Sequence, residues 1–461
     1  MGHKAKEEAG EGLLGAKSLS RRDFLKMAGI AGATIGVGAG LGGLVAACGG
    51  STTTTAASSA TTVATTATTG AVTTASTASS GPSTTVSAAA QPLKIGMVYD
   101  NSFPLHVMWK QEMDALIPDL NSKGGLTLGN GQKYTIDLIA YDGKRDAETS
   151  RSAVQRLISQ DKVAFIMGDE STDYWQPLTE AAKILVTAST PSSAILKPAN
   201  KLTFQASYLN TQASAVWGCI SENKPFKTVC AAHPDNLQGH AEGDHTKQLA
   251  GIFGQQVLKE IFYPPATTDF SAIATALIST GADVFTTCAG GPVSDAQLYR
   301  AMHQGGFKGF YLAYISWSIG SGSLVVSSDN FENITTVVQD TDNPTPAPTA
   351  KELIDLYTAK YGKWDFPASF HVLDWYLLKA ALEKSQSLDA DAVAAVIEAP
   401  LEYDTPTGHA RMVSRPDLGN SRNVDTLWQS QMANVTGGKY NMLHLITLDE
   451  AYAYNKKAYK W

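Results

Sequence analysis

Residues 162–194, KVAFIMGDESTDYWQPLTEAAKILVTASTPSSA, decide the expected fold. The apolar run 163–167 is short and ends at a glycine, as a buried parallel strand does. A polar loop over 169–173 follows, and residues 175–183 have the spacing of a helix. A second apolar run, 184–186, opens into a loop rich in hydroxyl side chains. The stretch therefore predicts two adjacent parallel strands joined by a helix. The side of that helix expected to face the core carries Trp175, Leu178, Ala181 and Ala182.

Both predicted strands end in polar loops that lead toward helices. Ligands in open α/β sheets bind at such strand ends, where helix N-termini offer free N–H groups and a positive dipole. The hydroxyl groups in these loops are therefore candidate ligand contacts, with the alternative that they only cap helices. The second loop holds Thr187, Ser189, Thr190, Ser192 and Ser193.

The same alternation of strand and helix runs through the chain from residue 93 and restarts near residue 211. It predicts an α/β fold with two doubly wound parallel-sheet lobes and a ligand cleft between them. Further strands are expected at 93–99, 134–141, 227–232, 256–263, 284–288, 309–313, 403–412 and 441–448. Further helices are expected at 107–120, 146–160, 211–222, 238–253, 270–279, 295–304, 351–361, 370–383 and 390–399.

Length and composition set outer bounds on the function. A chain of 461 residues is long enough for two or three domains. The net charge of −7 argues against a nucleic-acid-binding surface. Four cysteines are too few for a disulfide scaffold. The motifs of serine hydrolases, P-loop proteins and zinc peptidases are absent from the sequence, so no enzyme activity and no cofactor are predicted.

The N-terminal 47 residues are expected to be an export signal. Residues 20–26, SRRDFLK, form a twin-arginine motif, and the uncharged, Gly- and Ala-rich stretch 27–47 follows. This stretch ends in LVAACG, which resembles a bacterial lipobox and predicts lipid attachment at Cys48. The alternative is a plain transmembrane anchor. The predicted location is the outer face of the cytoplasmic membrane, reached by the twin-arginine route.

Residues 48–91 are expected to form a disordered tether. The segment consists almost entirely of Thr, Ser, Ala and Gly, so it cannot bury enough apolar surface to offset the entropy of ordering. A flexible chain of about forty residues has a root-mean-square reach of roughly 35 Å.

Several pieces occur in the order and spacing of one known family. They are LKIGMVY at 93–99, NSKGG at 121–125, VQRLISQDKVAFIMG at 154–168, PPATTDFS at 264–271 and TPTG at 405–408. With these pieces the chain resembles the type I periplasmic binding proteins, and within them the branched-chain amino-acid and amide receptors of ABC transporters.

The resemblance implies two lobes that close on a small ligand, an ABC permease as membrane partner, and a monomer. The first lobe would comprise 92–209 and 341–437, and the second 210–340 and 438–461. The expected ligand is amino-acid-like, an amide or a carboxylate. The rival interpretations are a ligand-sensing or regulatory protein on the same fold and, more remotely, a metal-dependent hydrolase.

The resemblance also implies which positions contact the ligand. Family members hold an α-carboxylate with hydroxyls and backbone N–H groups of the first lobe, and an ammonium with an acidic residue of the second. That acidic position falls in the segment YISW at 314–317, which has no carboxylate, so an amide, a urea-like compound or an apolar or aromatic carboxylate is expected instead of a zwitterion. Tyr174 and Trp175 could stack on the ligand or belong to the core. The predicted ligand-binding residues are Ser102, Asp169, Glu170, Ser171, Thr172, Ser189, Thr190, Gln238, Gly291, Tyr314 and Trp317.

Two further groups of residues could carry other chemistry. The segment HPDNLQGHAEGDH at 233–245 contains residue types that bind zinc, but a solvated helix start is the preferred interpretation and no metal is predicted. Cys219 and Cys230 could form a disulfide or remain buried thiols, and Cys288 is the third cysteine after the predicted export.

Overall fold

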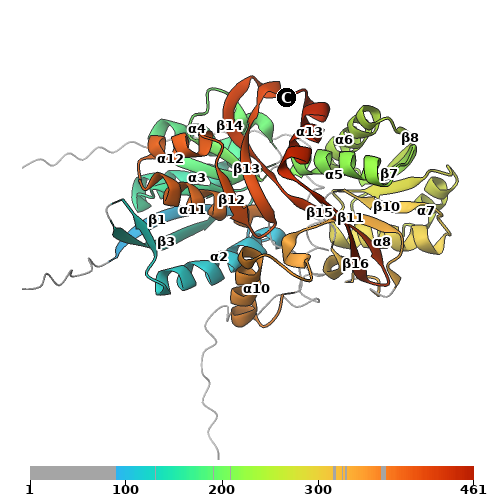
Figure 1. Ribbon diagram of the computed structural model, residues 1–461, viewed down its shortest axis with the longest axis horizontal. Helices are drawn as coiled ribbons and strands as arrows, with labels where there is room; N and C mark the ends of the chain where they lie inside the picture. The colour runs from blue at the N-terminus through green and yellow to red at the C-terminus, as the bar shows by residue number, and fades with distance from the viewer. Residues whose placement is uncertain are drawn as a thin grey trace, which may run out of the picture. The chain divides into compact units, whose positions relative to one another are not determined.

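Two sheets built mainly from parallel strands form the framework of the protein (Figure 1). The computed structural model describes residues 90–129, 131–190, 192–207, 209–314, 318–323, 325–327, 330–364 and 370–461. They fall within the compact unit that includes Ala89–Trp461. The predicted export signal, Cys48 and nearly all of the predicted tether lie outside the described residues.

The first sheet has six strands in the order β2-β3-β1-β4-β5-β6. All neighbours are parallel except β2 and β3, which form an antiparallel pair. Every residue of β4, β5 and β6 is buried, which is typical of strands covered on both faces. The strands are β1 (Gln91–Tyr99), β2 (Leu126–Leu128), β3 (Gln132–Asp142), β4 (Phe165–Gly168), β5 (Leu185–Ser189) and β6 (Thr203–Ser207).

The second sheet has seven strands in the order β16-β15-β11-β10-β9-β7-β8. The strands from β11 to β8 are parallel, whereas β15 and β16 run antiparallel at one edge. They are β7 (Thr228–Pro234), β8 (Gln256–Tyr263), β9 (Val284–Thr287), β10 (Phe310–Ala313), β11 (Ile334–Val338), β15 (Ser430–Thr436) and β16 (Lys439–Ile446). Because β15 belongs to this sheet, the C-terminal share of the second lobe begins near Ser430 and not at the predicted residue 438.

A third sheet is antiparallel, has the order β12-β13-β14, and contacts the first sheet through β14 and β6. Its strands are β12 (Glu402–Thr405), β13 (Gly408–Arg415) and β14 (Asn420–Trp428). The single strand predicted over 403–412 is wrong, because the chain reverses between Thr405 and Gly408 to form a hairpin. Gly408 has φ +145° and lies against the Gln429 carbonyl oxygen, so no side chain fits at this position.

The helices alternate with the parallel strands, as the sequence predicts for doubly wound lobes, and this fold class is confirmed. They are α2 (Pro104–Ser122), α3 (Ala147–Arg156), α4 (Thr172–Ala182), α5 (Leu209–Asn223), α6 (Leu237–Phe253), α7 (Ser271–Ile278), α8 (Gly291–Gln304), α9 (Ile319–Gly322), α10 (Pro348–Tyr361), α11 (Leu373–Ser385), α12 (Ala390–Glu398) and α13 (Leu448–Tyr459).

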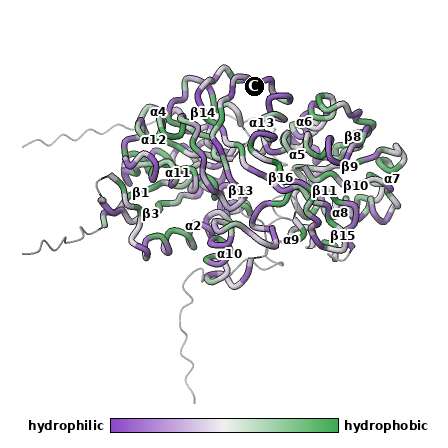
Figure 2. Tube along the Cα trace, viewed as in Figure 1, coloured by the Kyte–Doolittle hydropathy of each residue, from purple (hydrophilic) through white to green (hydrophobic). Residues whose placement is uncertain are grey.

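Hydrophobic and hydrophilic residues are mixed along the helices (Figure 2). α4 and α12 bury one side, whereas residues 211–220 of α5 are buried throughout. None of the helices in the described part of the chain is both long and apolar enough to span a membrane.

The face that α4 buries differs from the predicted one. Thr172, Gln176 and Thr179 are buried beside Trp175, whereas Ala181 and Ala182 are exposed. The threonine hydroxyls can be buried because they donate to backbone carbonyl oxygens within the same turn. The inward face of this helix carries polar residues, so the hydrophobic pattern of the sequence does not reveal it.

Candidate functional site

The candidate site lies where the strand order of the six-stranded sheet reverses. β1 pairs with β3 on one side and with β4 on the other, so the connections that leave β1 and β4 diverge to opposite sides. In open α/β sheets, this arrangement leaves a crevice at the C-terminal ends of the two strands. The residues that follow β1 and β4 are therefore the first place to look for a ligand site.

The loop after β4 is held together by its own polar groups. The Asp169 side chain accepts hydrogen bonds from the Ser171 N–H at 2.9 Å and from the Ser171 hydroxyl. The Thr172 hydroxyl donates to the Asp169 carbonyl oxygen at 2.6 Å. The Trp175 indole N–H donates to Ser171 Oγ at 3.1 Å. Asp169, Ser171, Thr172 and Trp175 are all at most 1% exposed, so this loop is a buried and fully folded turn.

A buried cluster of two histidines and one glutamate lies beside that loop. His106 Nε2 is 2.8 Å from Glu170 Oε2 and 3.1 Å from His371 Nε2. His371 Nε2 is 3.4 Å from Glu170 Oε1. In the part of the chain that the structure describes, these three form the one group of His, Cys, Asp or Glu side chains whose ligating atoms all lie within 4.8 Å of one another.

The His106 ring is fixed by the segment that follows β1. Its Nδ1 accepts the backbone N–H of Asp100 at 3.0 Å, so the ring proton is on Nε2. His106 packs edge-on against Phe103 and His371, and Trp109 lies next to both histidines. The cluster therefore combines the start of α2, the loop after β4 and the turn that precedes α11.

A second pair of polar side chains joins β5 to α11. Ser189 Oγ donates to Asp374 Oδ1 at 2.7 Å, and both side chains are buried. Thr190 follows Ser189 and is also buried, where its Oγ accepts the Ser192 N–H at 3.2 Å and its carbonyl oxygen accepts the Gln205 side-chain N–H at 2.6 Å. The hydroxyl groups after β5 thus form hydrogen bonds within the lobe.

Burial and charge shift the carboxyl groups of the site in different directions. Burial raises the pKa of Asp169 to about 6, and it raises the pKa of Asp374 well above its usual range. Burial would also raise the pKa of Glu170, but His106 and His371 outweigh it and hold that pKa well below its usual range.

The two imidazole rings differ in their environment. Burial lowers the pKa of His371, which stays neutral near pH 7. Burial also acts to lower the pKa of His106, but the neighbouring Glu170 carboxylate shifts it upward. A second proton on His106 would still have to displace the Asp100 N–H from Nδ1, so we assign the neutral Nε2–H form to this ring.

The predicted ligand-binding residues are distributed unevenly. Asp169, Glu170, Ser171, Thr172, Ser189 and Thr190 gather at the ends of β4 and β5. Ser102 is exposed, and its hydroxyl donates to Asp100 Oδ1 at 2.7 Å. Tyr174 is 44% exposed on the outer side of α4. Of the two interpretations of Trp175, the core position is correct, since the side chain is 0% exposed.

Among the described residues, the predicted contacts of the second lobe lie on separate elements. Tyr314 is 0% exposed, donates to or accepts from Thr246 at 3.0 Å and packs edge-on against Trp217, so it is core and not a stacking surface. Gly291 begins α8 with φ +80°. Gln238 lies in the first turn of α6, and Trp317 lies outside the described residues.

The histidine-rich segment at 233–245 does not form a metal site. His240 is exposed and pairs with Asp235 at 2.8 Å, whereas His245 is buried with its Nε2 3.1 Å from the Tyr459 hydroxyl. His233 is buried on β7 with its Nδ1 3.3 Å from the Cys288 carbonyl oxygen. The three side chains thus have separate partners.

Cys219, Cys230 and Cys288 are free thiols, which resolves the alternatives left open by the sequence. Burial raises the pKa of Cys219 to about 12 and that of Cys230 to about 11. These two thiols are packing residues and not nucleophiles.

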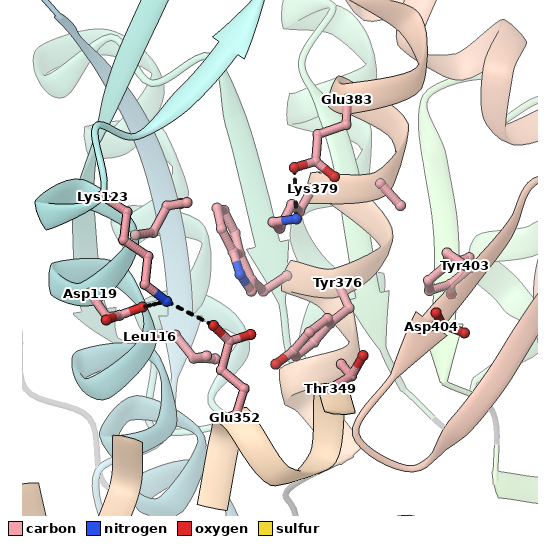
Figure 3. Close-up of a pocket in the computed structure, with 13 residues that line it drawn as sticks. Leu116, Asp119, Lys123, Thr349, Glu352, Tyr376, Lys379, Glu383, Tyr403 and Asp404 are labelled. Atoms are coloured by element: carbon pink, nitrogen blue, oxygen red, sulfur yellow. Dashed lines mark hydrogen bonds and ion pairs between the residues drawn. The ribbon is translucent and has the colours of Figure 1, made fainter. Parts of the chain in front are cut away.

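A cavity of about 390 Å³ lies elsewhere, among α2, α10, α11 and β12 (Figure 3). Its charged lining residues pair with one another. Lys123 binds Asp119 at 2.7 Å and Glu352 at 3.0 Å, and Lys379 binds Glu383 at 2.7 Å. Because these charges are already paired and partly exposed, the cavity is a weaker candidate than the strand ends.

Three residues of the site were missed in the sequence, namely His106, His371 and Asp374. His106 and His371 meet across 265 positions of the chain, and Asp374 meets Ser189 across 185. The only local signal is that His106 precedes Trp109 by three positions, which places both on one side of the helix that follows the first strand.

Comparison with known proteins gives the same fold throughout. The family model described as "Periplasmic binding protein" matches residues 92–434. The Leu/Ile/Val-binding protein homolog 7 of Brucella suis biovar 1 is 24% identical over 392 residues, which cover 78% of this chain and 92% of that protein.

Solved structures agree at low sequence identity. An ABC transporter substrate-binding protein from Aeropyrum pernix has a TM-score of 0.64 and 16% identity, covering 79% of this chain and 99% of that one. A solute-binding protein from R. palustris, in complex with 4-hydroxybenzoate, has a TM-score of 0.60 and 17% identity, covering 77% and 97%. LivJ from Streptococcus pneumoniae, in complex with isoleucine, has a TM-score of 0.60 and 13% identity, covering 77% and 99%. With two doubly wound lobes and a family match that spans most of its length, this chain belongs to the periplasmic binding proteins.

Proposed function

We propose that this protein is an extracytoplasmic solute receptor of an ABC importer. It captures a small ligand between its two lobes, closes around it, and delivers it to a permease in the membrane. The observation that carries this proposal is the family match over residues 92–434, which spans both parallel sheets. Closure of two domains about a hinge is the usual way in which such a layout holds a ligand.

The ligand site combines residues at the strand ends of both lobes. The first lobe contributes Asp169, Glu170, Ser171, Ser189 and Thr190, with Thr172 and Ser102 beside them. From the second lobe, Gly291, Gln238 and Trp317 are the candidate contacts. Met108 on α2 packs against Val293 on α8. The two helices are therefore in contact near their N-terminal ends, which follow β1 and β9.

The relatives bind chemically different molecules, so their names do not specify this ligand. The Brucella relative is named for leucine, isoleucine and valine, whereas the R. palustris structure holds 4-hydroxybenzoate. An uptake receptor for a small organic solute is common to both. In this role the protein has no enzymatic activity, needs no cofactor and acts as a monomer.

Export by the twin-arginine route and a lipid on Cys48 complete the proposal. The support is the SRRDFLK motif at 20–26 followed by an uncharged stretch and LVAACG. A receptor tethered in this way stays close to its permease.

A thermal-shift screen of the purified protein tests the receptor function. Compounds that bind only the folded state raise the melting temperature, by an amount that grows with their concentration relative to Kd. Amino acids, amides, amines and small carboxylates should be screened at millimolar concentration. At least one compound should raise the melting temperature in a saturable manner, and a complete absence of such compounds would contradict the proposal.

A further inference from the structure

We propose that the first lobe holds a positively charged nitrogen group of the ligand, of the ammonium, amidinium or guanidinium class, in place of the carboxylate that family members hold there. This inference rests on the proposed receptor function and specifies its substrate class.

The hydroxyl groups expected to donate to a ligand carboxylate already donate within the protein. The Ser171 hydroxyl donates to Asp169, and the Ser189 hydroxyl donates to Asp374 at 2.7 Å. The Thr172 hydroxyl donates to the Asp169 carbonyl oxygen at 2.6 Å. Of the hydroxyls at these two strand ends, Thr190 keeps a proton to donate, because its Oγ is an acceptor. The buried Thr187 hydroxyl on β5 has no hydrogen-bond partner among the described residues. A carboxylate would therefore find few free donors.

Two backbone donors of the loop after β4 are engaged as well. The Ser171 N–H donates to Asp169 Oδ1 at 2.9 Å, and the Thr172 N–H donates to the Asp169 carbonyl oxygen at 3.0 Å. These are the first free N–H groups of a helix N-terminus, which would otherwise bind an anion. The Asp169 carboxylate occupies that position itself.

An acceptor without a donor remains in the same place. Asp169 is 0% exposed, and its Oδ2 has no hydrogen-bond partner among the described residues. The nearest basic atom, His106 Nδ1, is 3.7 Å away and carries no proton, because it accepts the Asp100 N–H. A buried carboxylate oxygen in this state needs a donor, and a bound cation supplies one together with the matching charge.

The charges of the site point the same way. Glu170 is held as a carboxylate between His106 and His371, and the buried Asp169 adds a second carboxyl group. Among the described residues, the fixed positive charge near them is that of Arg145, whose Nε is 3.9 Å from Glu170 and whose guanidinium lies over the Phe103 ring. A ligand carboxylate would face like charges in a dry site, whereas a cation would face opposite ones.

A metal ion is the other cation to consider, since two histidines and a glutamate are zinc ligands. His106 would have to coordinate through Nε2, the atom that lies 2.8 Å from Glu170 and 3.1 Å from His371. That atom carries the ring proton as long as Nδ1 accepts the Asp100 N–H. The contacts of His106 therefore favour an organic cation, and binding of a metal ion is tested as the alternative.

The experiment compares ligands that differ in charge and hardly in shape. Amidinium, amide and carboxylate members of the acetyl, isovaleryl and benzoyl series, together with zinc chloride, are titrated against the full-length protein by thermal shift and calorimetry. We expect the amidinium member of the best-bound series to exceed its carboxylate by at least about a hundredfold in affinity, with the amide between them.

Two variants and the pH dependence of binding test whether the preference for the amidinium arises at this site. Glu170→Gln should lower the affinity for the amidinium at least about tenfold and narrow its advantage over the carboxylate, whereas Glu148→Gln on the exposed first turn of α3 should change neither. The amidinium should bind more weakly below about pH 6, because Asp169 takes up a proton there. The other titratable or charged groups that face Asp169 and Glu170 are His106, Arg145, His371 and Asp374.

Three results would overturn the inference. A carboxylate that binds as tightly as its amidinium would overturn it while leaving the receptor function intact. Saturable binding of zinc that His371→Ala abolishes would replace it with a metal site. If no member of any series raises the melting temperature while other compounds of the receptor screen do, the substrate class is wrong and the receptor function stands.

Discussion

At the scale of single residues, Ser171 is the clearest case in which a predicted ligand contact also supports the fold. Its hydroxyl donates to Asp169 and accepts the Trp175 indole N–H at 3.1 Å, and the residue is 1% exposed. Ser171→Ala leaves the buried Trp175 indole N–H without an acceptor and removes one of the two hydrogen bonds that Asp169 Oδ1 accepts. We expect the free energy of unfolding in urea to fall by about 1–3 kcal/mol. Ser102→Ala, at an exposed hydroxyl, should change it by less than about 1 kcal/mol, and equal stability of the two variants would contradict the account.

Asp374 makes a prediction about pH. Burial raises the pKa of its carboxyl well above its usual range, so the folded state binds a proton that the unfolded state releases near pH 4. This group therefore destabilises the protein increasingly as the pH rises above about 4. Asp374→Asn keeps the oxygen that accepts from Ser189 and removes the titration. The free energy of unfolding of this variant, relative to the wild type, should therefore increase as the pH rises.

The control for this experiment is Asp283, a carboxylate whose effect on stability changes with pH in the opposite direction. The backbone N–H of Lys227 and the Thr228 groups lower the pKa of Asp283, so this exposed carboxylate stabilises the protein above about pH 4 and ceases to do so in acid. Asp283→Asn should lose stability relative to the wild type near neutral pH and not in acid. Urea denaturation from about pH 2 to pH 8 measures both variants, because the contribution of Asp283 is lost only below about pH 4. Parallel curves for Asp374→Asn and the wild type would exclude the proposed titration.

The site could be predicted from the sequence only in part. Two polar loops after neighbouring strands are a local pattern, and Asp169 to Thr190 were found through it. The direction in which each hydroxyl donates depends on partners such as Asp374, which is 185 positions from Ser189. His106 and His371 could not be joined either, because nothing in either segment indicates the other.

At the scale of elements, the hairpin of β13 and β14 contains a buried ion pair. Arg415 Nη1 is 2.8 Å from Asp425 Oδ2, and the two side chains are 3% and 0% exposed. Asp417 accepts two further hydrogen bonds from the same guanidinium. Arg415→Met would leave the Asp425 carboxylate buried without its partner, and we expect a loss of about 3–5 kcal/mol in the free energy of unfolding.

A double variant separates the charge from the packing. Arg415→Met combined with Asp425→Leu removes both charges and should recover a large part of the stability lost in Arg415→Met alone. Denaturant titration of the single and double variants gives the coupling. A double variant less stable than Arg415→Met would show that the pair acts through shape and not through charge.

The elements themselves were predicted well where one period dominates. The buried strands β1, β4, β7 and β9 are short apolar runs between turn residues, and their positions in the sequence were found within a few residues. The elements that were missed are β2, β6, β11, β14, β15, α9 and α13. The sequences of β14 and β15, NSRNVDTLW and SQMANVT, carry polar residues that only the sheet pairing accommodates. α4 was found, but with the wrong inward face.

At the scale of the whole molecule, the order of strands and helices was sufficient for the two lobes. Each restart of the β-α pattern corresponds to one parallel sheet, and both sheets reverse their strand order, at β1 and β7 respectively. The C-terminal segment was harder to assign. It supplies α11 and α12 beside the first sheet and β15 and β16 to the second. No sequence pattern indicates which sheet a strand near the C-terminus joins.

The membrane anchor is the last prediction, and it concerns the entire chain. If Cys48 carries the lipid, Cys48→Ser should move the protein from the membrane fraction to the soluble extracytoplasmic fraction, because a serine hydroxyl cannot form the thioether. Cys288→Ser, which alters a cysteine within the folded part, should stay with the membrane. Ligand binding measured by thermal shift should be unchanged in Cys48→Ser, since the site lies more than fifty positions away in the sequence, at residues 169–190 and beyond. A Cys48→Ser protein that remains fully in the membrane fraction would favour a transmembrane anchor in residues 27–47.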